Sequence, residues 1–180
     1  MNHSTLTHLS RYRGYKELGM LDDALCELEN IDKEDRLNPG VLAASVNASV
    51  ISENWELLAD VSSQLVKQYP DEPLWWVCWA NGVRRHESIE AANNILLHAM
   101  QRFPEHPDVF YCYGCNHSLM KNYKLAFAFV IRAIQLKEKL AQSAIEDEDL
   151  SDLWEHVKKN FYCPRTQTWT KSPTTWREWL

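Results

Sequence analysis

Cys112 and Cys115 have the C-x-x-C spacing at which two thiols can share a metal ion or form a redox pair, and His117 follows them. Cys78 lies 34 residues before Cys112, so a thiol or metal site at Cys78, Cys112 and Cys115 is one alternative function. Such motifs usually come with a second ligand pair or follow a strand. The sequence offers neither, and the pair lies in a helical pattern. We therefore expect small packing residues here, with His117 on a buried face.

The other residue types that commonly act in catalysis do not occur in a recognised catalytic pattern. Acidic residues occur in runs on the outer faces of helices, as at Asp22–Asp23 and Glu146–Asp149, rather than as isolated pairs. No serine lies in a G-x-S-x-G turn. With 5 glycines in the chain, neither of the two common Gly-rich nucleotide-binding motifs occurs. We predict a non-enzymatic protein with no catalytic residues, no bound cofactor and no metal.

The composition of the chain excludes further classes of function. The chain of 180 residues is 45% hydrophobic and 24% charged, as is usual for globular proteins. Its net charge of -6, without a basic stripe, argues against a nucleic-acid partner. No apolar run approaches the roughly 18 residues of a membrane span, and residues 1–15 contain no signal-like apolar block. We therefore predict a cytoplasmic protein, no membrane partner, and reduced thiols for its 5 cysteines.

A period of 34 residues organises most of the chain. Pro39, Pro73 and Pro107 share this spacing, and so do Pro70 and Pro104. Proline is tolerated in the first turn of a helix and disfavoured in its interior. Each Pro-x-x-Pro bracket therefore indicates that one helix ends and the next begins.

Between the brackets the apolar pattern is helical. In the third unit one face repeats at i, i+3, i+4 and i+7, at Trp76, Trp79, Ala80 and Val83. A second helix follows at Ala92, Leu96 and Ala99, with Ser88 as its expected N-cap. Each unit is thus a helical hairpin whose apolar face needs neighbouring units to cover it.

This pattern resembles the tetratricopeptide repeat (TPR) family, in its bacterial form, whose signature is W-x2-[LG]-G-x2-Y, A-x3-F, A and P. The unit from Pro73 matches best and the unit from Pro107 next. Units in register cover about 5–38, 39–72, 73–106 and 107–138, so a repeat region spans 1–138. The resemblance implies an all-α, right-handed solenoid of about four hairpins with a C-terminal capping helix. It also implies a module that binds a protein or peptide partner.

The resemblance places the first helix of each unit along a concave groove. Groove-facing candidates are Leu9, Arg13, Asn47, Val77, Asn81, Arg84, Tyr111 and Cys115. Asn47 and Asn81 are equivalent positions, and an Asn amide suits the backbone of an extended peptide. Arginines can pair with acidic side chains or a terminal carboxylate. The clamp with which some family members hold chaperone tails is not expected, because its positions are mostly taken by Leu9, Ala44, Leu74 and Cys78.

The C-terminal quarter departs from the period. Residues 139–161 are predicted to form a capping helix that covers the last repeat with Leu150, Leu153, Trp154 and Val157. The acidic run before them is expected to be solvated, and a charged docking patch is the alternative.

The tail, 162–180, contains Trp169, Trp176 and Trp179. Large aromatic side chains bury much apolar area, so the tail is expected to fold back or to dock on a partner or a second copy. A structural role with self-association through this Trp-rich tail is therefore a further alternative function.

Overall fold

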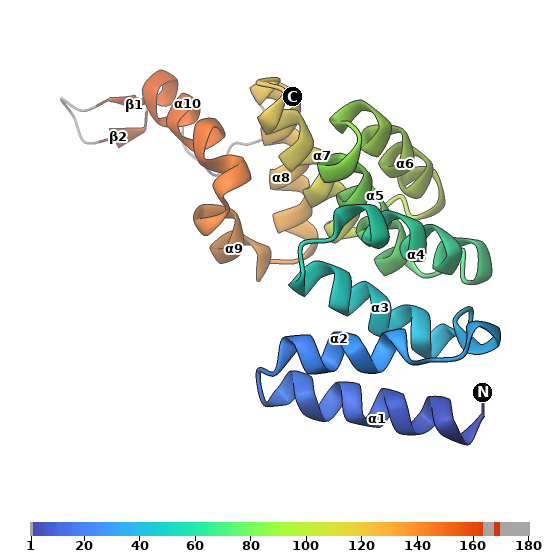
Figure 1. Cartoon of the computed structure of the whole chain (residues 1–180). Helices are drawn as coiled ribbons and strands as arrows, with labels where there is room; N and C mark the ends of the chain where they lie inside the picture. Colours follow the sequence, from blue (N-terminus) through green and yellow to red (C-terminus); the bar gives the residue numbers. More distant parts are fainter. Residues whose placement is uncertain (1, 164–167, 170–180) are drawn as a thin grey trace. The chain divides into compact units, whose positions relative to one another are not determined.

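The structure is a computed structural model that describes the backbone of residues 2–163 and 168–169 and the side chains of residues 2–160. Within these residues the chain forms helical hairpins in sequence order (Figure 1). The hairpin helices are α1 (His3–Glu17) with α2 (Leu21–Glu29), α3 (Pro39–Ile51) with α4 (Trp55–Gln68), α5 (Pro73–His86) with α6 (Ile89–Arg102), and α7 (Pro107–Leu119) with α8 (Tyr123–Leu136). A short 3-10 turn, η1 (Lys33–Asp35), follows α2. The predicted all-α repeat is thereby confirmed.

Helix starts follow the predicted signals. Pro39, Pro73 and Pro107 are the first residues of α3, α5 and α7. Ser88 caps α6, because its hydroxyl oxygen accepts a hydrogen bond from the backbone N–H of Ala91 at 3.1 Å. The brackets therefore end and begin helices as expected.

Three of the hairpin turns share a backbone conformation, whereas the turn between α5 and α6 does not, because Glu87 at the same register position has a φ of -114°. Gly19, Glu53 and Lys121 all have a positive φ, of 74°, 53° and 60°, and they occupy equivalent register positions. Glycine adopts this left-handed conformation without strain, whereas Glu53 and Lys121 carry a Cβ that disfavours it.

The chain divides into two compact units between Ala92 and Asn93. In the first unit α4 and α5 approach closely at Gly82, where an added Cβ would lie 2.6 Å from the backbone N of Ala59. In the second unit α7 and α8 meet at Gly114, where a Cβ would lie 2.7 Å from Val130 Cγ2. Each unit therefore has a glycine that lets two helices touch.

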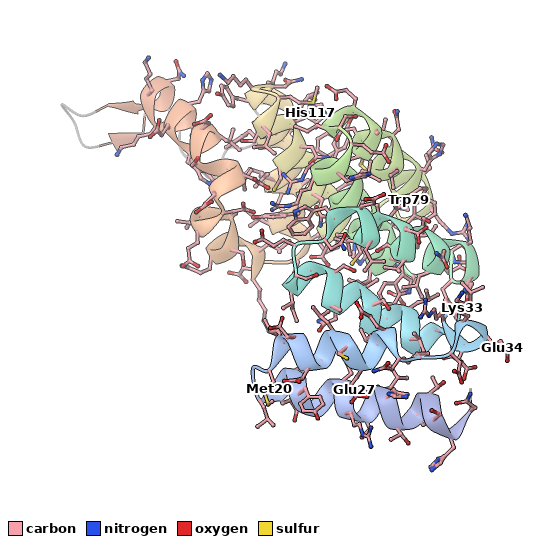
Figure 2. All side chains as sticks on the ribbon, viewed as in Figure 1. Met20, Glu27, Lys33, Glu34, Trp79 and His117 are labelled. Atoms are coloured by element: carbon pink, nitrogen blue, oxygen red, sulfur yellow. The ribbon has the colours of Figure 1, made fainter. Side chains whose placement is uncertain are left out.

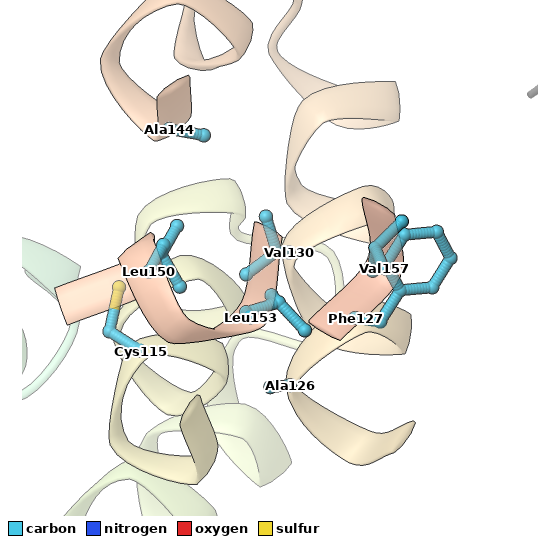
Figure 3. Close-up of a cluster of buried hydrophobic side chains, with 8 residues drawn as sticks. All are labelled: Cys115, Ala126, Phe127, Val130, Ala144, Leu150, Leu153 and Val157. Carbon is cyan, nitrogen blue, oxygen red and sulfur yellow. The ribbon is translucent and has the colours of Figure 1, made fainter. Parts of the chain in front are cut away.

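The capping region differs from the predicted single helix. It consists of α9 (Leu140–Glu146), the 3-10 turn η2 (Glu148–Leu150) and α10 (Ser151–Phe161). Asp147 breaks the helix because its backbone is extended and its side chain accepts a hydrogen bond from the N–H of Asp149. The predicted packing of this region is confirmed: Leu150, Leu153 and Val157 are buried (Figure 3). Trp154 packs against the same cluster.

After α10 the chain forms a two-stranded ladder, β1 (Tyr162–Cys163) with β2 (Thr168–Trp169), which the sequence analysis did not predict. Tyr162 pairs with Trp169 in an antiparallel register. The side chain of Trp169, and all of Trp176 and Trp179, lie outside the described part of the chain. Over that part, no helix has the length and apolar character needed to cross a membrane.

Candidate functional site

The first helices of the unit that ends at Ala92 form one layer. The Tyr12 hydroxyl on α1 donates a hydrogen bond to Asn47 Oδ1 on α3 at 3.0 Å. Trp75 and Cys78 of α5 pack against a core cluster that includes Leu42 and Val46 of α3. These contacts place α1, α3 and α5 side by side in one layer. We call the surface that carries Arg13, Asn47, Val77, Asn81 and Arg84 the first-helix face.

This layer is cationic although the chain is acidic. α3 has no charged residue, and α5 has no carboxylate. The Lys and Arg residues of α1, α3 and α5 are Arg11, Arg13, Lys16, Arg84 and Arg85, and their carboxylate is Glu17. The second helix α2 has the opposite character, with four acidic residues, Asp22, Asp23, Glu27 and Glu29. Charge is therefore segregated between the two helix layers.

Two of these cations are engaged by second helices. Arg11 Nη1 lies 3.8 Å from Glu27 Oε1 on α2, beside the 2.6 Å contact of His8 Nδ1 with Glu27 Oε2. Glu27 is labelled in Figure 2. The Arg85 guanidinium stacks 4.5 Å above the ring of Trp55 on α4. Of the other cations, Arg13 is exposed, and Lys16 Nζ lies 5.9 Å over the ring of Tyr12.

Most predicted groove residues of this unit retain accessible surface. Arg13 and Asn47 are exposed, and Val77, Asn81 and Arg84 are half-buried. Leu9 does not: it is 5% exposed and packs in a cluster with Ile31 and Val41. The structure places Leu9 in the core because Ile31, from the segment after α2, covers it. It is not available as a contact for a partner.

Tyr111 and Cys115, the predicted groove residues of α7, are covered by the chain itself. The Tyr111 hydroxyl donates to Asp147 Oδ2 at 2.7 Å, and the Cys115 thiol lies 3.8 Å from the same oxygen. Cys115 also belongs to the buried cluster of Leu150 and Leu153 (Figure 3). Burial, and then the hydrogen bond to Asp147, raise the pKa of Tyr111 well above its usual range. This face of α7 is therefore occupied, contrary to the prediction of an open groove.

The thiols and His117 show packing environments. Burial raises the pKa of Cys78 to about 11, whereas redox and metal-binding cysteines need a lowered pKa. His117 is buried as predicted, with its ring 4.5 Å from that of Tyr113, and burial lowers its pKa. Over the described residues no group of three His, Cys, Asp or Glu side chains is placed to hold a metal ion.

An apolar hollow in the first unit was not predicted. It lies between α2, α3 and α4, has a volume of about 580 Å³, and is lined by Leu25, Leu28, Leu37, Leu57 and Val61. Leu37 is 61% exposed and Leu57 is 39% exposed. The charged residues Glu29, Arg36 and Asp60 also line the hollow. Of the two second helices that line the hollow, α2 has 9 residues and α4 has 14.

Comparison with known proteins identifies the fold. No protein-family model and no curated protein matches the chain. The structure is similar to that of MamA MSR-1 C2, with a TM-score of 0.65 and 15% identity over 75% of this chain and 78% of that chain. It is also similar to TTC0263, a thermophilic TPR protein of Thermus thermophilus, with a TM-score of 0.60 and 18% identity over 97% of this chain and 96% of that chain. At these identities the similarity shows the fold, and that fold is of the TPR type.

Proposed function

We propose that the protein is a non-enzymatic interaction module whose first-helix face binds a peptide or an extended segment of a protein partner. The observation that carries the proposal is the cationic character of this face in a chain of net charge -6. A cationic face that carries two Asn at equivalent positions can pair with acidic groups and hold a peptide backbone.

Asn47 is oriented for this role by Tyr12. The hydroxyl of Tyr12, which is 3% exposed, donates to Asn47 Oδ1, so the amide oxygen is engaged and the amide N–H groups of the exposed Asn47 are the donors that a partner would use. These N–H groups are donors suited to the carbonyl oxygens of an extended chain. Asn81 occupies the equivalent position on α5, so a segment lying across α3 and α5 would meet a donor at each helix.

A photocrosslinking experiment tests the proposal. A photoreactive amino acid replaces Val50, which is 47% exposed on α3 one turn after Asn47. A matched probe replaces Lys67, which is exposed on α4. We expect a crosslinked partner from the Val50 probe and not from the Lys67 probe. Adding Asn47→Ala and Asn81→Ala should lower the yield, while the loss of the Tyr12 hydrogen bond should lower the thermal midpoint only slightly, so that the double variant stays folded. Equal yields from both probes, or an unchanged yield in the double variant, would contradict the proposal.

A second candidate function, self-association through the tail, is favoured by the leucine-lined hollow. The segment Trp176–Leu180 combines two Trp and a Leu with Arg177 and Glu178. Glu29 and Asp60 at the hollow complement Arg177, and Arg36 complements Glu178. We propose that this segment of a second copy enters the hollow.

Sedimentation equilibrium tests this second candidate with two variants. Deletion of residues 170–180 and Leu57→Glu, which charges the hollow, should each give a monomer. Leu97→Glu is the control, because Leu97 is 43% exposed on α6 and does not line the hollow. A full-length chain that is monomeric at high concentration would contradict self-association, and an oligomer that survives the deletion would exclude the tail.

A further inference from the structure

We propose that the partner segment carries an acidic residue and a large apolar residue two positions apart, and that both bind where the α1–α2 turn meets the end of α3. The inference rests on the proposed function and specifies its ligand. Its starting point is a small apolar depression that Lys16 of α1, Leu21 of α2 and Ile51 of α3 line together. We call the surface of these three residues the α1–α3 edge.

The α1–α3 edge exposes large apolar side chains. Leu21 is 41% exposed and Ile51 is 39% exposed, and buried Ala24 and Ala48 line the depression with them. Val50, next to Ile51, is 47% exposed. Apolar side chains that gather on one surface, rather than singly, mark places where a partner binds. An apolar side chain of the partner would therefore be buried against Leu21 and Ile51.

The turn between α1 and α2 is more apolar than the next two hairpin turns. It carries Leu18, which is 74% exposed, and Met20, which is 43% exposed and is labelled in Figure 2. The equivalent residues of the next two turns are polar: Ser52 and Asn54, then His86 and Ser88. Terminal repeats usually present a polar outer surface. Exposed apolar residues at this turn therefore indicate a binding surface.

Lys16 supplies the charge of the α1–α3 edge. Of the residues that line the depression Lys16 is the charged one, and the exposed residues Glu17, Asp22 and Asp23 do not line it. Its ammonium lies 5.9 Å over the ring of Tyr12. Because an ammonium has three N–H groups, this contact leaves donors for a carboxylate. An acidic residue of the partner would therefore form an ion pair with Lys16.

Tyr12 connects this charge to the first-helix face. Its ring lies under the Lys16 ammonium, and its hydroxyl donates to Asn47 Oδ1 at 3.0 Å. The ammonium and the Asn47 amide are thus within reach of about four residues of extended chain. Because alternate residues of an extended chain share a face, a carboxylate at Lys16 and an apolar side chain at Ile51 require a spacing of two.

Selection from a library of 12-residue peptides displayed on phage tests the inference, with the full-length protein as bait. We expect enriched peptides to carry an acidic and a large apolar residue two positions apart. Lys16→Glu should change the enriched charge from acidic to basic, because it reverses the charge that pairs with the segment. Glu17→Lys is the matched control: Glu17 is exposed and outside the depression, so its peptides should keep the acidic residue.

Fluorescence anisotropy with a labelled copy of an enriched peptide locates the two contacts. Ile51→Ser should weaken binding by about tenfold, as expected when an aliphatic contact is lost. Leu125→Ser is its control and should leave binding unchanged, because Leu125 is 40% exposed on α8 and lies outside the edge. Lys16→Gln should weaken binding by about twofold to fivefold and reduce its dependence on salt.

Three results would overturn the inference: no enriched peptide, enriched peptides without the acidic and apolar pair, or the same enrichment with Lys16→Glu as with the parent chain. Failure here is distinguishable from failure of the proposed function. If the Val50 probe still captures a partner through Asn47 and Asn81, and Lys16→Glu and Ile51→Ser do not lower the yield, the first-helix face stands and the specificity of the α1–α3 edge falls.

Discussion

The first helices α5 and α7 carry side chains at equivalent repeat positions, yet these side chains differ in exposure and in their contacts. On α5 Asn81 and Arg84 keep accessible surface, whereas on α7 Cys115 is 5% exposed and Tyr111 is bonded to Asp147. The repeat fixes where these side chains point in both helices. The difference comes from the segment after the last repeat. Residues 147–150 return over α7, and the 34-residue period does not predict this.

The difference shows that a register position is not in itself a binding site. One position of the repeat is a core contact at Leu9 on α1, a contact with the chain's own acidic turn at Tyr111 on α7, and accessible surface at Val77 on α5. Whether a side chain at this position is accessible depends on the segments that follow the last repeat and α2. Four sets of substitutions break or sharpen this comparison.

The largest effect is expected from Leu150→Ala. Leu150 is 0% exposed in the cluster that covers α7, so a cavity should form and the free energy of unfolding should fall by about 2–5 kcal/mol. Urea denaturation measures the change, and hydrogen exchange should speed up at α7 amides. Ile145→Ala is the control, because Ile145 is 70% exposed. Equal losses in the two variants would contradict an occupied α7 face.

Alanine at the two contact glycines compares the helix packing of the units. At Gly82 the added Cβ meets backbone atoms of Ala59, whereas at Gly114 its nearest contact is the end of the Val130 side chain. Gly82→Ala should therefore cost about 3 kcal/mol and Gly114→Ala about 1–2 kcal/mol. Gly14→Ala, with open space around it on α1, should stabilise by about 0.5–1 kcal/mol. Thermal unfolding measures all three, and the reverse order of the first two would refute the packing described.

Two tyrosines compare the hydrogen bonds at the open and occupied faces. Tyr111 donates to a carboxylate and Tyr12 donates to the exposed amide of Asn47. Tyr111→Phe should lower stability by about 1.5 kcal/mol and Tyr12→Phe by about 0.5 kcal/mol, because hydrogen bonds to charged groups contribute more. Urea denaturation of both variants checks this, and a larger loss for Tyr12→Phe would show that Asp147 is not held by Tyr111.

The smallest effect concerns His117 and pH. Burial lowers its pKa from 6.5, so the folded state holds a neutral ring where the unfolded chain would take up a proton. Its contribution to stability is therefore complete above the unfolded pKa and declines as the pH falls below about 6.5. Measuring the free energy of unfolding at about pH 7.5 and about pH 5.5 should show a smaller loss in His117→Phe than in the parent chain. An equal loss would exclude His117 as a source of the pH dependence.

Much of the fold follows from local signals in the sequence. Pro73 and Pro107 start helices because their φ suits a first turn, and Ser88 caps α6 because its hydroxyl oxygen can satisfy a free N–H. The leucines of the capping region follow from helical periodicity. Gly82 was missed because close approach of α4 and α5 depends on the partner helix, which no local pattern describes.

The candidate site was predicted less well than the fold, because the accessibility of its side chains depends on neighbouring segments that no local pattern describes. Asn47, Asn81 and the arginines were assigned to the face by register, and their role there stays a proposal, as does a cytoplasmic location. Leu9 is covered by Ile31, late in the first unit, and Tyr111 and Cys115 are covered by Asp147, which follows the last unit. The break at Asp147 was missed because a run of acidic residues is also compatible with a continuous helix.

The most direct test observes the side-chain amides of Asn47 and Asn81 by nuclear magnetic resonance of the full-length protein. Titration with the partner captured by the Val50 probe should shift both side-chain signals and the backbone amide of Arg13. It should leave the amides of Leu37 and Leu57, at the hollow, in place. Shifts confined to the hollow, or to α7 and the capping region, would contradict the account that the first-helix face is where this protein binds its partner.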